Sequence, residues 1–97
     1  MEIKINVYKD CASEEPSKTF VVRRILFKTA KEIGSLQEEA KNASESEQEA
    51  FTLKMLQCVI PEFKKEDLDG IDPIELGAFF RELGGEVAKV VDEARKN

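Results

Sequence analysis

Residues 61–75 read PEFKKEDLDGIDPIE and divide the second half of the chain into two helical parts. Pro61 ends the apolar run before it, because proline has no backbone N–H and its ring clashes with a preceding helical turn. Asp72-Pro73, followed by Glu75, is a typical helix start, since Asp caps free N–H groups and Pro fits the first turn. The stretch therefore predicts two helices joined by a short connector. Three apolar side chains anchor this connector: Phe63, Leu68 and Ile71.

The first 27 residues predict a β-hairpin. Ile3, Ile5 and Val7 alternate with polar residues, which is the period-two pattern of a half-buried strand. Residues 19–27 are rich in β-branched and aromatic side chains and predict the second strand. Its two faces carry Phe20, Val22 and Leu26 on one side and Val21, Ile25 and Phe27 on the other. The polar segment 10–18 forms the loop, and the hairpin must pack on helices because two strands alone are marginally stable.

Residues 28–60 predict one helix or two. Thr29-Ala30-Lys31-Glu32 has the spacing of a capping box, in which the hydroxyl and the carboxylate satisfy free backbone donors. Two further capping boxes predict a new helix start at Ser44 or at Ser46. We therefore expect a break near residues 42–46. A single long helix is the alternative, because this segment contains no Gly or Pro.

The last predicted helix, from Asp72 onward, carries the most regular apolar repeat in the chain. Apolar residues recur at spacings of four and three, as in a coiled-coil seam: Leu76, Phe80, Leu83, Val87, Val90 and Ala94. Gly84-Gly85 interrupts the repeat and is read as a close helix contact, a hinge or the end of one helix, three readings that the sequence does not rank. The chain is predicted to be one α+β domain over 1–97, mostly helical. A hairpin at 1–27 packs on about three helices within 28–96.

One face of this last helix is wider in apolar residues than a hairpin and two short helices easily cover. Apolar surface that remains uncovered marks an oligomer or partner interface. The candidate surface consists of five residues: Phe79, Phe80, Leu83, Val87 and Val91. The alternative is that the whole stripe is buried in a single core.

Size and charge limit the classes of function. The chain has 97 residues, a net charge of −5 and a pI of about 4.8. This length supports one modest core, and the negative charge disfavours binding to nucleic acid or to an anionic membrane. Basic residues are scattered apart from Arg23-Arg24. That pair is either a contact for an acidic partner or the ordinary exposed face of a strand.

The compartment is predicted from three observations. No apolar run approaches the roughly 20 residues that a membrane-spanning helix needs. Met1–Ile5 lacks the basic segment and long apolar segment of a signal peptide. Cys11 lies in a polar loop and Cys58 in an apolar helical run, and these two cysteines do not make a disulfide framework. We therefore expect a cytoplasmic protein.

The sequence contains no motif for a recognised chemistry. It has no His and no Trp, and no CxxC, phosphate-loop or serine-nucleophile motif, so the commonest general base and metal ligand are missing. Asp67 and Asp69, with Gly70, resemble part of a calcium-binding loop. In that register the first and last ligand positions, which need Asp and Glu, fall on Lys65 and Leu76. The sequence therefore predicts a protein that is not an enzyme and that holds no cofactor or metal.

The order of these parts resembles the tail assembly chaperones of long-tailed bacteriophages and prophages. The similarity covers residues 18–83 and rests on the strand at 19–27 followed directly by a helix, on the stop Pro61-Glu62-Phe63, and on the segment 68–76, LDGIDPIEL. The resemblance implies that the chain binds the tape measure protein and keeps it soluble while tail tube subunits polymerise around it. It also implies the tail tube protein as a further candidate partner. A second copy of the chain is another candidate, because of the apolar face of the last helix.

A second class of function stays open: a small cytoplasmic adaptor or regulatory subunit that binds one folded partner. A neighbouring tape measure gene would favour the chaperone, whereas a neighbouring enzyme or toxin gene would favour the adaptor.

The resemblance further implies a longer product, made when ribosomes slip near the end of the short reading frame. Codons AGA, AAA and AAC would encode Arg95-Lys96-Asn97 and would contain a slip sequence, A-AAA-AAC. The alternative is that the two basic side chains simply complement the negative end of a helix dipole.

Overall fold

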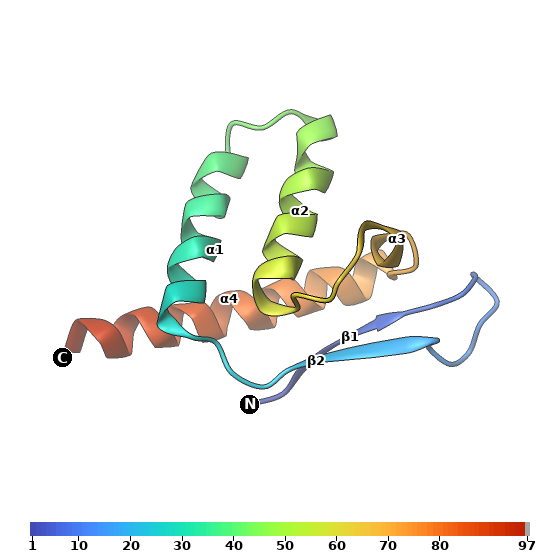
Figure 1. The fold of residues 1–97 in the computed structure, drawn as a ribbon, viewed down its shortest axis with the longest axis horizontal. Helices are drawn as coiled ribbons and strands as arrows, with labels where there is room; N and C mark the ends of the chain where they lie inside the picture. Colours follow the sequence, from blue (N-terminus) through green and yellow to red (C-terminus); the bar gives the residue numbers. More distant parts are fainter. Residues whose placement is uncertain (97) are drawn as a thin grey trace.

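The computed structural model describes residues 1–96 of the chain, and Asn97 lies outside the described residues. Two strands are followed by four helices, in the order β1 (Ile3–Val7), β2 (Lys18–Val22), α1 (Phe27–Ala40), α2 (Glu45–Val59), α3 (Lys65–Leu68) and α4 (Pro73–Lys96) (Figure 1). The strands form one antiparallel hairpin that packs against the helices. The predicted α+β class is therefore confirmed.

The hairpin has one core-facing side, set by its register. Ile3 lies opposite Val22 and Ile5 lies opposite Phe20, so these apolar side chains share one face. The predicted second strand, 19–27, is too long at its end, because β2 stops at Val22. The reason is that β1 begins at Ile3, opposite Val22, and offers later residues no strand to pair with.

The segment after β2 belongs to a helix start rather than to a strand. Ile25 is buried in the core, whereas Leu26 and Phe27 are exposed, so the predicted strand faces do not extend past Val22. The predicted capping box at Thr29 is also wrong. Leu26 is the N-cap, with an extended backbone, and its C=O accepts a hydrogen bond from Ala30 N–H at 3.0 Å. The first turn of α1 thus begins before Thr29, which lies inside that turn and is buried.

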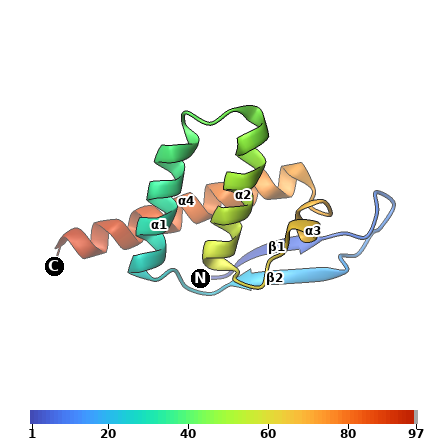
Figure 2. The ribbon, with the colours of Figure 1, turned by 45° about the horizontal axis from the view of Figure 1, so that its top comes forward.

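Residues 27–59 form two helices, as the first of the two later capping boxes predicts. Ser44 is the N-cap of α2, and Glu47 Oε1 accepts hydrogen bonds from the Ser44 hydroxyl at 2.9 Å and from Ser44 N–H at 3.5 Å. The Gln48 side-chain amide donates to the Ala40 C=O at 2.8 Å and so ties the two helices together across the turn. Figure 2 shows α1 and α2 as an antiparallel hairpin that crosses α4, with its connecting loop pointing away from the sheet.

The end of the second helix and the start of the last helix agree with the prediction, and the connector holds one addition. α2 ends at Val59, just before Pro61, and α4 begins at Pro73, where Asp72 Oδ1 accepts a hydrogen bond from Ile74 N–H at 2.8 Å. Between them lies α3 (Lys65–Leu68), a single helical turn within the segment that was predicted only as a short connector. Glu75 does not take part in the cap. It accepts a hydrogen bond from the Asn6 side-chain amide at 2.9 Å and links α4 to β1.

The core takes side chains from every layer of the fold. α4 packs on β1 and on α1, and α1 packs on α2. The largest fully buried side chains come from the sheet, from α1, from α2, from the connector and from α4: Ile5, Ile33, Leu56, Phe63, Phe79 and Leu83. The rings of Phe63 and Phe20 meet edge to face, with 5.4 Å between their centroids. The connector is therefore an integral part of the core rather than a surface loop.

α4 runs without interruption through Gly84-Gly85. Neither glycine has a positive φ, and a Cβ added at either one would meet no atom within 4 Å outside the local helix. The interpretations of Gly84-Gly85 as a helix end and as a close helix contact are therefore wrong. The interpretation as a hinge stays a prediction.

Replacing Gly84 or Gly85 by Ala should raise the free energy of unfolding by about 1 kcal/mol each, because Ala loses less backbone entropy in a helix. Urea denaturation of the single variants would measure this increase. Ala88→Gly, at an exposed position of the same helix, is the matched reverse control and should lower stability by a similar amount. A loss of stability in the Gly→Ala variants would contradict the assignment of an uninterrupted, unconstrained helix.

Asp67 in α3 is a buried carboxylate with two donors. Its side chain is 4% exposed and accepts hydrogen bonds from Lys18 Nζ at 2.9 Å and from Lys64 N–H at 3.0 Å. Burial raises the pKa of Asp67, but the hydrogen bonds and the positive charge of Lys18 outweigh it and lower the pKa below the usual value. The side chain holds the first residue of β2 against the connector, which is a structural role.

The Asp67→Asn variant should lose about 2 kcal/mol of stability at neutral pH, because a charged hydrogen-bonding group is removed from a buried position. Since folding lowers the pKa of Asp67, its contribution is complete above the unfolded-state pKa of about 3.9 and is lost as the pH falls through the lower folded value. The difference between wild type and variant should therefore shrink in that acidic range. Urea titrations at several pH values would measure it.

Asp69→Asn is the control for this prediction, because Asp69 is exposed at the end of the same turn. It should change the free energy of unfolding by less than about 0.5 kcal/mol. An equal effect of the two substitutions, or a difference that does not depend on pH, would contradict the role assigned to the buried carboxylate.

Candidate functional site

The structure divides the apolar surface predicted on α4 into a buried and a partly exposed portion. Phe79 and Leu83 are each 2% exposed and lie inside the core. Phe80, Val87 and Val91 are half-buried and pack against the edge of the same core. In this conformation a partner could reach only the latter three of the five candidate residues. A role for them in self-association or partner binding stays a prediction.

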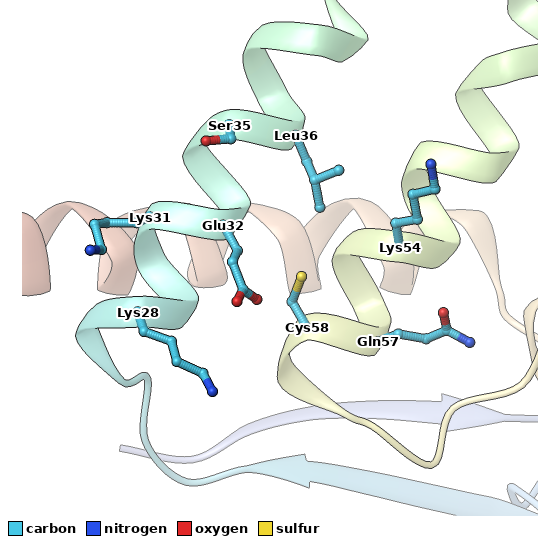
Figure 3. A pocket seen from close by; sticks show the side chains of 8 residues that line it. All are labelled: Lys28, Lys31, Glu32, Ser35, Leu36, Lys54, Gln57 and Cys58. Atoms are coloured by element: carbon cyan, nitrogen blue, oxygen red, sulfur yellow. The ribbon is translucent and has the colours of Figure 1, made fainter.

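A shallow groove of about 860 Å³ runs between α1 and α2 (Figure 3). It is lined by four groups of side chains: the lysines Lys28, Lys31 and Lys54, the carboxylate Glu32, the polar Ser35 and Gln57, and the half-buried Leu36 and Cys58. The two helices expose this groove because α1 and α2 pack on each other as a hairpin and only one side of the hairpin rests on the rest of the fold.

Two half-buried apolar side chains and one carboxylate point into the groove. Figure 3 shows Glu32, Leu36 and Cys58 pointing into the space between the two helices. Burial, together with the negative charge of Glu32 and a hydrogen bond to it, raises the pKa of the Cys58 thiol. A thiol with a raised pKa stays protonated at neutral pH and is a poor nucleophile. Cys58 therefore behaves as a small hydrophobic side chain, as its place in the sequence indicates.

The rim of the groove is basic. Lys28 and Lys54 stand on opposite helices, and Lys31 lies on the outer side of α1 (Figure 3). Lys31 Nζ lies 5.0 Å from the centre of the Phe27 ring, and Lys54 Nζ lies 5.4 Å from the centre of the Phe51 ring. Such cation–π contacts favour particular positions of the two ammonium groups without neutralising their charge.

This basic rim could not be predicted from the sequence, for a geometric reason. The three lysines are separated by 26 positions at most and look like the solvated faces of two separate helices. They border one groove only because α1 and α2 fold back on each other at Ser44. The nearest signal in the sequence was the half-apolar character of residues 51–59, where a Lys and a Gln interrupt the apolar run.

A second hollow, of about 640 Å³, lies where the end of β1 meets the connector. Its lining is strongly acidic: Asp10, Glu14, Glu66, Asp69, Asp72 and Glu75. Asp72 caps α4 and Glu75 accepts a hydrogen bond from Asn6, so two of these carboxylates already have structural roles. Among residues 1–96, no group of three or more Asp, Glu, Cys or His side chains is arranged to hold a metal ion.

The Arg23-Arg24 pair follows β2 and is exposed. Arg23 Nη1 donates to Glu2 Oε1 at 3.0 Å, which closes the open end of the hairpin with a surface ion pair. Such exposed pairs contribute little to stability. The structure therefore gives Arg23 an ordinary partner within the chain.

Comparison with models of protein families, with curated proteins and with solved structures finds no match for this chain. Within the part of the chain that the structure describes, no helix is both long enough and apolar enough to cross a membrane. The groove between α1 and α2, together with the half-buried side chains of α4, remains the best candidate for a binding site.

Proposed function

We propose that this chain is a tail assembly chaperone of a long-tailed bacteriophage or prophage. In this role it binds apolar helical segments of the tape measure protein in the bacterial cytoplasm and keeps that protein soluble while the tail tube assembles. Its action is binding without catalysis. The phage context of the proposal comes from the resemblance carried by residues 18–83.

The observation that supports a helix-binding role is the groove between α1 and α2. Two helices that expose an apolar floor between them offer the surface into which an amphipathic helix lays its apolar face. Leu36 and Cys58 form that floor, and polar side chains surround it. A chaperone needs such a surface on an otherwise soluble body, and the net charge of −5 favours solubility.

Co-expression with a tape measure protein tests the proposal. The chain and the tape measure protein encoded beside it would be produced together in a bacterial host, and the soluble fraction of the tape measure protein would be measured after centrifugation. We expect the tape measure protein to stay soluble and to co-purify with the chain. Leu36→Glu, which places a charge on the floor of the groove, should weaken both effects.

Glu49→Lys is a control variant for this experiment, because Glu49 is exposed on α2 and does not line the groove. Far-ultraviolet circular dichroism would establish that both variants are folded. The proposal is overturned if the tape measure protein is equally insoluble with and without the chain. A stable complex with one folded partner, combined with that result, would replace the chaperone by an adaptor.

A further inference from the structure

We propose that the groove between α1 and α2 binds an acidic amphipathic helix, whose apolar stripe covers Leu36 and Cys58 and whose carboxylates face Lys28 and Lys54. This inference rests on the proposed function, since it names the chemistry of the segment that the groove would take. The occupant is a segment of a partner protein.

The first argument is charge complementarity. The whole chain has a net charge of −5, yet the groove is lined by three lysines and only one carboxylate. The ion pairs within the described residues involve Lys4, Lys18, Arg23, Lys41 and Lys89, and none involves a lysine of the groove. The ammonium groups of Lys28 and Lys54 therefore keep their charge available to an incoming carboxylate.

The second argument is the distribution of polarity across the groove. Lys28 and Lys54 lie on different helices, with the half-buried Leu36 and Cys58 between them (Figure 3). An amphipathic helix presents an apolar stripe with polar residues on either side of it. Its stripe would therefore meet the floor while acidic residues on both flanks meet the two lysines.

The third argument concerns Glu32, which points into the middle of the groove (Figure 3). A nucleic acid or another polyanion would bring phosphates against this carboxylate, and like charges at close range repel. A helix with carboxylates only on its flanks brings fewer negative charges against Glu32 than a polyanion does. The position of this one acidic side chain thus favours a helical segment over a polyanion.

Two designed peptides of about 18 residues, or five helical turns, provide the test. Both have the same leucine stripe at helical spacing, but one carries Glu and the other Lys on its flanks. Fluorescence anisotropy would give the dissociation constant of each peptide for the full chain. We expect the Glu peptide to bind roughly tenfold more tightly at low salt, and the difference to shrink as the salt concentration rises.

Charge-reversal variants test whether Lys28 and Lys54 contact the peptide. The double variant Lys28→Glu/Lys54→Glu should weaken binding of the Glu peptide by roughly tenfold and strengthen binding of the Lys peptide. The control is Lys9→Glu/Lys65→Glu, which makes the same change in net charge at exposed lysines outside the groove and should have much less effect. If the reversed variant unfolds, Lys28→Gln/Lys54→Gln tests the same contact without introducing negative charge.

Three results would overturn the inference: equal affinity for the two peptides, equal effects of the groove and control variants, or tighter binding of a single-stranded oligonucleotide than of the Glu peptide. The co-expression experiment separates this inference from the proposed function. If Lys28→Glu/Lys54→Glu keeps the tape measure protein as soluble as wild type does, the inference about the groove is wrong and the proposed chaperone function is retained. If wild type does not solubilise that protein but binds the Glu peptide through Lys28 and Lys54, the proposed chaperone function is wrong and the inference about the groove is retained.

Discussion

Phe63→Ala should lower the free energy of unfolding by about 4 kcal/mol, the largest loss that we expect from a single substitution in this chain. Phe63 is 1% exposed, and its ring packs edge to face against Phe20 of β2. Removing the ring leaves a cavity where the connector meets the sheet and also removes the aromatic contact. Thermal unfolding followed by circular dichroism should show a decrease in Tm of roughly 15 °C or more.

Phe27→Ala is the matched control, because it removes the same side chain from a position that is 49% exposed. Its cost should stay below about 1 kcal/mol, with the loss of the cation–π contact to Lys31 as the main part. Similar Tm decreases for the two variants would show that the connector does not belong to the core.

Gly70→Ala should lower the free energy of unfolding by about 3 kcal/mol through overpacking and the strain on one hydrogen bond. A Cβ at Gly70 would lie 2.6 Å from the Tyr8 C=O oxygen and 2.7 Å from Val7 Cγ1. The connector would have to move away from β1. The hydrogen bond from Tyr8 N–H to the Gly70 C=O, 2.7 Å long, would be lengthened or broken.

Gly77→Ala is the control for Gly70→Ala. Gly77 is exposed in α4, and an added Cβ there meets no atom within 4 Å outside the local helix. This variant should be more stable than wild type by about 1 kcal/mol. Urea denaturation of the two variants should therefore give changes of opposite sign. A stabilised Gly70→Ala variant would contradict the close approach of the connector to β1.

The boundaries that the sequence predicted correctly are those that a few neighbouring residues determine. Pro61 ends α2, Asp72-Pro73 starts α4 and Ser44 starts α2, and in each case the chemistry lies within one turn of the boundary. The failures concern residues whose state depends on distant partners. β2 ends at Val22 because of the register with Ile3. The capping box at Thr29 is not formed because α1 already begins at Phe27, so Thr29 lies inside the first turn.

The candidate site also depends on contacts between distant residues that the sequence does not reveal. The apolar repeat on α4 is real, but the sequence could not tell which of its residues the sheet and α1 would cover. Phe79 and Leu83 turned out to be buried, whereas Phe80 and Val87 remain partly exposed. The basic rim depends on how α1 and α2 are rotated against each other, which tertiary packing decides and local sequence does not.

The position of α4 determines the order in which the chain can fold during synthesis. Among the described elements, α4 is made last, and it packs on β1, which is made first. Until Phe79 and Leu83 have left the ribosome, the apolar faces of the hairpin and of α1 have no cover, so the nascent chain cannot close its core. Closing contacts between such distant segments is slower than forming local helical ones. The contacts that close this core can therefore form only after α4 has been synthesised.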